Sequence, residues 1–254
     1  MGIPTQKGFL RLSGGSLGET TFVKSEDGYR AKEKIVYLKN HFDKNPEYER
    51  VRENAANFGN ASSAASKIRM CVYTFLAQRK DGKMFRNLQS LVTKVIKLDP
   101  TGARGKQQIK SEYLDLLVGF EMNSTCSFKS VFNTRFNINA DRVSGKVDIN
   151  IPAFIPGLRI NAPKGSTHFT LIAAASVINF DGNEKPQQVH FESEPMSLHD
   201  SLTDDWKIAF TLLPGSVHPI FIYLGVEFTE ATLGVRSPVA HRKKDALCIV
   251  KVIP

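Results

Sequence analysis

The sequence predicts an α+β protein in which hairpin and helical elements precede an antiparallel β-sandwich. Three observations support this class. Apolar runs around turn residues open the chain, two segments with helical periodicity follow, and later apolar residues alternate with polar ones in several short runs. Strands and helices do not alternate regularly, so a parallel sheet is not expected. We therefore expect a basic hairpin and helical region at residues 1–112 and a β-sandwich domain at residues 113–254.

Residues 7–38 have the pattern of a small β-meander, with Asp27-Gly28 as a typical hairpin dipeptide. The stretch Gly14-Gly15-Ser16-Leu17-Gly18 also matches G-x-S-x-G, the motif around the nucleophile of many serine hydrolases. That motif requires a helix directly after the serine, whereas β-branched and aromatic residues follow here. We therefore expect Ser16 to belong to a hairpin turn and not to be a nucleophile.

A first helix is expected from Pro46 to about residue 80, with Asn45 as its N-cap. Small residues spaced by three and four form one face of it: Ala55, Gly59, Ser62, Ser63 and Ser66. Glycine and serine are weak helix formers, so such a face needs a packing reason. It can pack against the second helix of the same chain, or it can form a contact between subunits.

A second helix is expected after Asp81-Gly82, and Asp99-Pro100 ends it. Its apolar face consists of Phe85, Leu88, Leu91, Val92, Val95 and Ile96. A short turn between the two helices would make an αα-hairpin.

Roughly seven strands are expected beyond residue 113, separated by turn residues, which is typical of an immunoglobulin-like sandwich. One strand is expected within residues 126–140, where Phe128, Phe132, Phe136 and Ile138 alternate with other residues. The other runs are residues 145–151, 166–180, 187–193, 204–213, 217–228 and 245–253.

Positive charge is concentrated in the first part of the chain. Residues 1–112 hold 21 Lys and Arg against 11 Asp and Glu, a net of +10, whereas residues 113–254 hold 13 against 14, a net of −1. Such asymmetry indicates either an anionic partner or a solvated basic face. The candidate nucleic-acid-binding residues are Arg52, Lys67, Arg69, Arg79, Lys80, Arg86, Arg104 and Lys106.

The sequence argues against several other classes. Cys71, Cys126 and Cys248 are widely spaced, so we expect buried thiols and no metal site. The histidines are scattered, and the one His/carboxylate cluster, residues 199–205, reads as a polar loop. No cofactor, small-molecule substrate or catalytic residue is expected. No run is long enough to span a membrane and no signal peptide is evident, so we expect a cytoplasmic protein.

Several motifs resemble a family of uncharacterised bacterial proteins that have a glycine-rich hairpin and helix in front of a β-sandwich. They are residues 7–18, the Lys24–Gly28 turn, the Asn45–Asn54 helix start, Gly119–Glu121, Pro163–Phe169 and Leu224–Phe228. These are turn and packing residues, so the resemblance implies a fold and no activity.

Two functions remain after these exclusions. The first is a non-enzymatic structural or interaction protein that associates with itself or docks in a larger assembly through its hairpin and helices, with Gly59, Ser62, Ser63 and Ser66 in the contact. The alternative is a nucleic-acid-binding protein that uses the basic front. Against it, the front lacks zinc-finger spacing, aromatic RNA-binding runs and an obvious helix-turn-helix.

The interpretation of Ser16 can be tested directly. A fluorophosphonate probe, which reacts with activated serines, should leave the pure protein unlabelled because the sequence predicts no helix directly after Ser16. Labelling that disappears in Ser16→Ala would show that Ser16 is a nucleophile.

Overall fold

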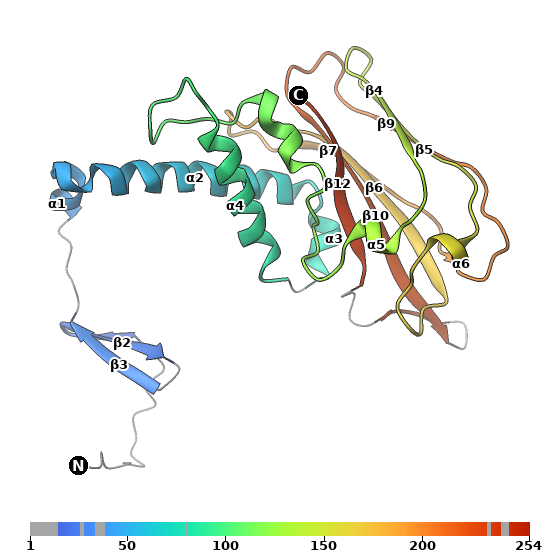
Figure 1. Cartoon of the computed structure of the whole chain (residues 1–254), viewed down its shortest axis with the longest axis horizontal. Helices are drawn as coiled ribbons and strands as arrows, with labels where there is room; N and C mark the ends of the chain where they lie inside the picture. Colours follow the sequence, from blue (N-terminus) through green and yellow to red (C-terminus); the bar gives the residue numbers. More distant parts are fainter. Residues whose placement is uncertain (1–14, 26–27, 34–38, 80, 233–234, 240–243) are drawn as a thin grey trace. The chain divides into compact units, whose positions relative to one another are not determined.

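The computed structural model describes residues 15–25, 28–33, 39–79, 81–232, 235–239 and 244–254 (Figure 1). The chain divides into two units, Met1–Arg52 and Glu53–Pro254. The boundary expected from the sequence, after residue 112, stays a prediction. The α+β class with an antiparallel sandwich is confirmed.

The first unit contains a three-stranded antiparallel meander in the order β1-β2-β3. Its strands are β1 (Gly15–Leu17), β2 (Thr20–Ser25) and β3 (Gly28–Glu33). Ser16 lies in β1 opposite Thr21, so it is a strand residue beside the turn, and a strand instead of a helix follows it. Residues 1–14, which include part of the expected meander, lie outside the described residues.

The rest of the first unit leads into the helices. Helix α1 (Lys39–Lys44) precedes the 3₁₀ turn η1 (Pro46–Tyr48). Asn45 caps η1 as expected, because its side-chain oxygen accepts the Glu47 N–H at 3.0 Å.

The expected first helix is divided in the structure. It consists of α2 (Glu49–Met70) and the short α3 (Tyr73–Ala77), since Val72 between them has a non-helical φ of −128°. Helix α4 (Met84–Lys97) matches the expected second helix, and Leu88, Val92, Val95 and Ile96 of its apolar face are buried. The 3₁₀ segment η2 (Ser111–Leu117) leads to the sheets.

The larger sheet is six-stranded and antiparallel, with β11-β10-β6-β7 in order, β12 paired to β10, and β8 paired to β6. Its strands are β6 (His168–Val177), β7 (Gln187–Glu192), β8 (Met196–Ser197), β10 (Ile220–Thr232), β11 (Val235–Pro238) and β12 (Ala246–Ile253). The smaller sheet has the order β4-β5-β9 and contains β4 (Asn137–Asp141), β5 (Lys146–Ile151) and β9 (Trp206–Thr211).

One strand expectation needs a correction. The strand expected within residues 126–140 begins only at Asn137, because Phe128–Val131 forms a helical turn, α5. The phenylalanines that fit a period of two lie in this turn and in the extended segment after it. The rings of Phe128 and Phe132 stack, with their centroids 5.3 Å apart. A second helical turn, α6 (Pro156–Arg159), follows β5.

Strand β10 connects two hydrophobic cores. Alternate residues from Ile220 to Phe228 enter the core between the two sheets, whereas Phe221 and Tyr223 enter the second core, which also contains residues of α2, α3 and α4. These helices lie beside the large sheet in Figure 1. Strands β6 and β12 alternate in the same way. The large sheet is therefore the middle of three layers, and its central strands are buried on both faces.

The outer edge of β12 is covered by residues 119–122. Gly119 N–H donates to the Ile249 carbonyl at 2.8 Å, Ile249 N–H donates to the Phe120 carbonyl at 3.0 Å, and Met122 N–H donates to the Leu247 carbonyl at 2.7 Å. These bonds satisfy backbone groups that would otherwise be exposed at a sheet edge.

We expect Gly225→Ala to destabilise the protein by about 1–3 kcal/mol, as overpacking does in a filled core. A methyl group at this position of β10 would overlap the Ala246 carbonyl oxygen and lie 3.1 Å from Leu247 Cα, both backbone atoms of β12. Urea unfolding measures the change. The matched control is Gly59→Ala on α2, where a Cβ has nothing within 4 Å and should stabilise the helix by about 0.5–1 kcal/mol. Equal effects of the two changes would contradict this packing.

Candidate interaction surface

Helix α2 has one buried face and one exposed face. The buried residues are Asn57, Ala61, Ala64, Ala65 and Ile68. Ile68 is fully buried in the helix–sheet core, and its carbonyl oxygen lies 3.5 Å from the Tyr223 hydroxyl of β10. The alanines allow the helix backbone to approach the sheet and α4 closely.

The small residues of the expected contact face lie away from this core. Gly59 and Ser63 are exposed, and Ser62 and Ser66 are half-buried. The alternative in which Gly59 and Ser63 pack against the second helix of the same chain is therefore wrong. The alanine face fills that role, because Ala61, Ala64 and Ala65 are buried in the helix–sheet core.

The exposed face of α2 is uncharged over several turns. From Asn54 to Ser66 the helix contains no Asp, Glu, Lys or Arg. Solvent-facing helix surfaces usually carry charged residues, so this composition is unusual. Large apolar side chains are exposed on the same helix and just after it: Phe58 is 58% exposed and Tyr73 is 59% exposed.

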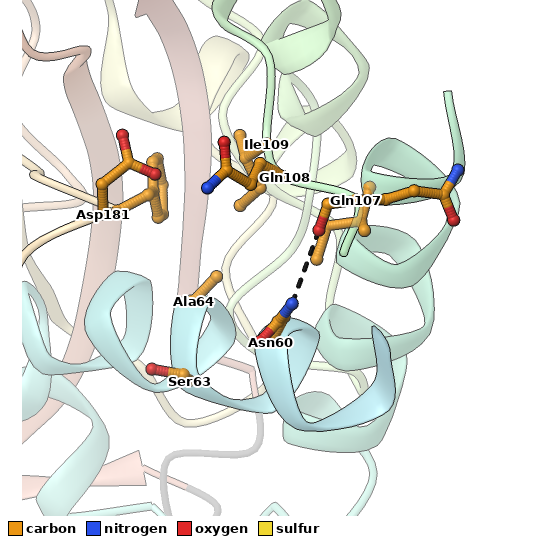
Figure 2. A pocket seen from close by; sticks show the side chains of 9 residues that line it. Asn60, Ser63, Ala64, Gln107, Gln108, Ile109 and Asp181 are labelled. Atoms are coloured by element: carbon orange, nitrogen blue, oxygen red, sulfur yellow. Dashed lines mark hydrogen bonds between the residues drawn. The ribbon is translucent and has the colours of Figure 1, made fainter. Parts of the chain in front are cut away.

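A polar pocket of about 180 Å³ borders this surface (Figure 2). Asn60, Ser63 and Ala64 of α2 line one side, and Gln108 and Asp181 lie on the other. The Asn60 side-chain amide lies 3.4 Å from the Gln107 carbonyl oxygen. Ser63 therefore belongs both to the uncharged helix face and to the wall of a pocket that offers hydrogen-bonding groups.

Lys67, a candidate for phosphate contact, holds helix α2 to a loop of the same chain. Its ammonium donates to the carbonyl oxygens of Asn179 at 2.7 Å, Phe180 at 3.2 Å and Gly182. Three bonds use all the donors of a lysine. Lys67 thus fixes α2 to the loop that follows β6 and has no donor left for a phosphate.

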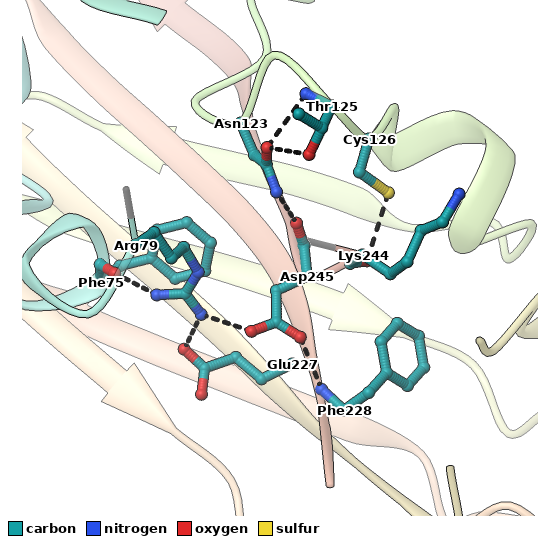
Figure 3. Close-up of polar contacts among 9 residues, drawn as sticks. All are labelled: Phe75, Arg79, Asn123, Thr125, Cys126, Glu227, Phe228, Lys244 and Asp245. Carbon is teal, nitrogen blue, oxygen red and sulfur yellow. Dashed lines mark hydrogen bonds and ion pairs between the residues drawn. The ribbon is translucent and has the colours of Figure 1, made fainter. Parts of the chain in front are cut away.

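Arg79 is likewise an internal residue (Figure 3). Its guanidinium lies 3.3 Å from the Phe75 ring centroid, donates to the Phe75 carbonyl, and pairs with Glu227 and, at 2.8 Å, with Asp245. The Arg79 side chain is only 5% exposed. This cluster joins the end of α3 to β10 and to the start of β12. The carboxylates of Glu227 and Asp245 neutralise the Arg79 charge, which was expected to contact a phosphate.

Asp245 connects the cluster to the chain around it. Its carboxylate accepts the Phe228 N–H at 2.9 Å, and its backbone carbonyl accepts the Asn123 side-chain amide at 2.6 Å. Burial raises the pKa of Asp245 to about 6, although the nearby Arg79 charge acts in the opposite direction and Glu227 adds to the increase.

The glycine-containing loop at residues 101–110 does not form a phosphate site. The Asp99 carboxylate occupies its centre and accepts the N–H groups of Gln108 and Thr101, both at 3.0 Å. These hydrogen bonds hold the pKa of Asp99 well below its usual range, and the bond from Gln108 has the largest effect. A carboxylate of the chain therefore takes the place that an anionic ligand would need.

The other basic candidates divide into three groups. Arg69, Arg86, Arg104 and Lys106 are exposed, and Arg69 lies over the Phe85 ring at 5.3 Å. Arg52 donates to the carbonyls of Phe42 and Asn45 within the first unit. Lys80 lies outside the described residues. Four of the eight candidates are thus exposed cations in the part of the chain that the structure describes.

The three cysteines are free thiols. Cys71 and Cys248 are buried, as expected, and Cys126 is half-buried. Burial raises the pKa of Cys71 and of Cys126 to about 11 each, so neither thiol is activated at neutral pH. Within the described ranges, no group of three or more His, Cys, Asp and Glu side chains is placed to hold a metal ion.

Comparison with known proteins adds no relative: no family model matches the chain, and no curated protein matches it by sequence. In the part of the chain that the structure describes, no helix combines the length and apolar character needed to cross a membrane.

The buried Asp245 predicts a pH dependence of stability. The pKa of Asp245 in the folded protein, about 6, lies above the ordinary value of 3.8, so its contribution to stability is fully present below about pH 4 and is lost as the pH rises through 6. As the pH rises from 5 to 7.5, ionisation of Asp245 should lower the free energy of unfolding by about 1 kcal/mol. Urea titrations of the wild type and Asp245→Asn measure it, because the variant lacks this contribution and keeps the other titrating groups. Parallel pH profiles for the two proteins would contradict it.

Proposed function

We propose that the protein is a non-enzymatic structural or interaction protein that associates with itself or with other protein subunits through its N-terminal hairpin and helices. The exposed face of α2 carries the proposal, because it has no charged residue from Asn54 to Ser66 yet remains in solvent in the single chain. Small side chains allow a partner backbone to approach, and Phe58 offers an apolar anchor beside Gly59.

The proposal includes a contact within which Gly59, Ser62, Ser63 and Ser66 meet the partner. A Cβ on Gly59 would meet nothing within 4 Å, so there is open space above the helix at this point. The pocket beside Ser63 supplies amide and carboxylate groups for hydrogen bonds at the rim of such a contact. We place the protein in the cytoplasm, where its free thiols would stay reduced. The resemblance to uncharacterised bacterial proteins remains part of the proposal and implies no activity.

Nucleic-acid binding is the alternative, and the structure reduces its support. Lys67 and Arg79 make internal contacts, which leaves Arg69, Arg86, Arg104 and Lys106 as exposed candidates among the described residues. Four phosphate contacts on duplex DNA would give a slope of about −3.6 in log K against log salt. Such binding would be weak at physiological salt without further contacts.

We expect Ser63→Arg to reduce self-association without lowering the melting temperature. The new charge would lie in the proposed contact, where it would be buried without a partner, whereas Ser63 is exposed in the single chain. Light scattering coupled to size-exclusion chromatography, over a range of protein concentrations, measures the mass of each variant. The matched control is Ser90→Arg, which adds the same charge at an exposed position of α4.

Three results would count against this proposal. The same loss of mass in Ser90→Arg would make the effect one of net charge. A wild type that stays monomeric at all concentrations would contradict self-association. A monomer that binds nucleic acid with sub-micromolar affinity at physiological salt would favour the alternative.

A further inference from the structure

A groove of about 480 Å³ lies between the residues that follow η2, strand β12 and the segment from α5 towards β4. Val118, Gly119 and residues 248–250 form one wall, and residues 128–136 contribute to the other. The volume falls in the range of roughly 300–1,000 Å³ that is typical of small-molecule sites.

The walls of the groove are mostly apolar. Phe128, Phe132 and Phe136 line it, with ring centroids 5.3 Å apart for Phe128 and Phe132 and 6.3 Å apart for Phe128 and Phe136. Phe128 and Phe132 are also part of the core between the sheets, so this wall is fixed by packing. Val118, on the other wall, is 43% exposed and stands at the opening.

Among the described residues that line the groove, only Lys129 carries a charge. No carboxylate of the described residues forms an ion pair with Lys129, and its side chain is exposed. Glu121 does not line the groove, and it accepts hydrogen bonds from the Ser127 hydroxyl and the Phe128 N–H. Burial raises the pKa of Glu121, and the Lys129 charge acts in the opposite direction.

One polar group of the lining, the Thr134 hydroxyl, has no hydrogen-bond partner among the described residues, although it is buried. Buried polar atoms are almost always paired, and this hydroxyl is one of several buried side-chain atoms of the described residues that have no hydrogen-bond partner there. Asn133, next to it, adds an exposed amide to the same lining.

We propose that this groove binds an amphipathic carboxylate with an unbranched hydrocarbon chain. The chain packs between the three phenylalanines and Val118, and the carboxylate pairs with Lys129 at the rim. The apolar lining selects a hydrocarbon, and the lone positive charge selects an anionic head group over a neutral or cationic one. This site does not depend on the proposed self-association, which involves another part of the molecule.

Decanoate, octanoate, 1-decanol and decyltrimethylammonium, each below its micelle-forming concentration, are suitable probes of the full chain. Isothermal titration and amide chemical shifts, with Gly119 as a reporter, measure binding. We expect saturable binding of decanoate, about tenfold weaker binding of octanoate because two buried methylenes are lost, and weaker binding of the alcohol and the ammonium compound.

Lys129→Met removes the charge and keeps the chain length, and Val118→Trp fills the opening. Lys129→Met should weaken decanoate by about fivefold and leave decanol unchanged, while Val118→Trp should weaken both. Lys164→Met, another exposed lysine, is the matched control and should change neither. Equal affinity for decanoate and decanol, with no effect of Lys129→Met, would overturn the anionic head group. Binding that Val118→Trp does not affect, or no saturable binding, would overturn the site.

Discussion

The burial of the large sheet on both faces is the constraint on which the other contacts depend. Successive side chains of β10 point to opposite faces of the sheet: one set enters the core between the sheets, and the other enters the core under the helices. Each face needs its own cover, because an uncovered apolar face would remain in water. The helices thus complete the sheet, and Lys67 and the Arg79 cluster attach them at two polar points. These same attachments remove two cations from the basic front.

Much of this architecture could be predicted from the sequence, because periodicity reports it locally. The alternation of Ile222, Leu224 and Val226 predicts a strand, and the apolar spacing in α4 predicts a helix with one buried face. The short helical turn at Phe128–Val131 was missed, since its phenylalanines also fit a period of two. Periodicity could not show that the helices cover the sheet, because their partners lie far away in the sequence.

The candidate surface was harder to predict than the fold. The small-residue spacing marked an unusual face of α2, but the small residues that pack inside the chain are Ala61, Ala64 and Ala65. The roles of Lys67 and Arg79 depend on loops and strands more than a hundred residues away. Glu227, a charged residue that directly follows the apolar run 220–226 of β10, was a local signal of a partner inside the molecule.

The long separation between the helices and their sheet partners also has a consequence for synthesis. Helix α4 ends at Lys97, but β10 begins at Ile220 and β12 at Ala246. The apolar side of α4 therefore leaves the ribosome well before the strands that will cover it. Contacts of such high sequence separation form slowly, and the uncovered helices can meet other nascent chains in the meantime. The growing polypeptide should thus depend on chaperones more than a chain of the same size built from local contacts.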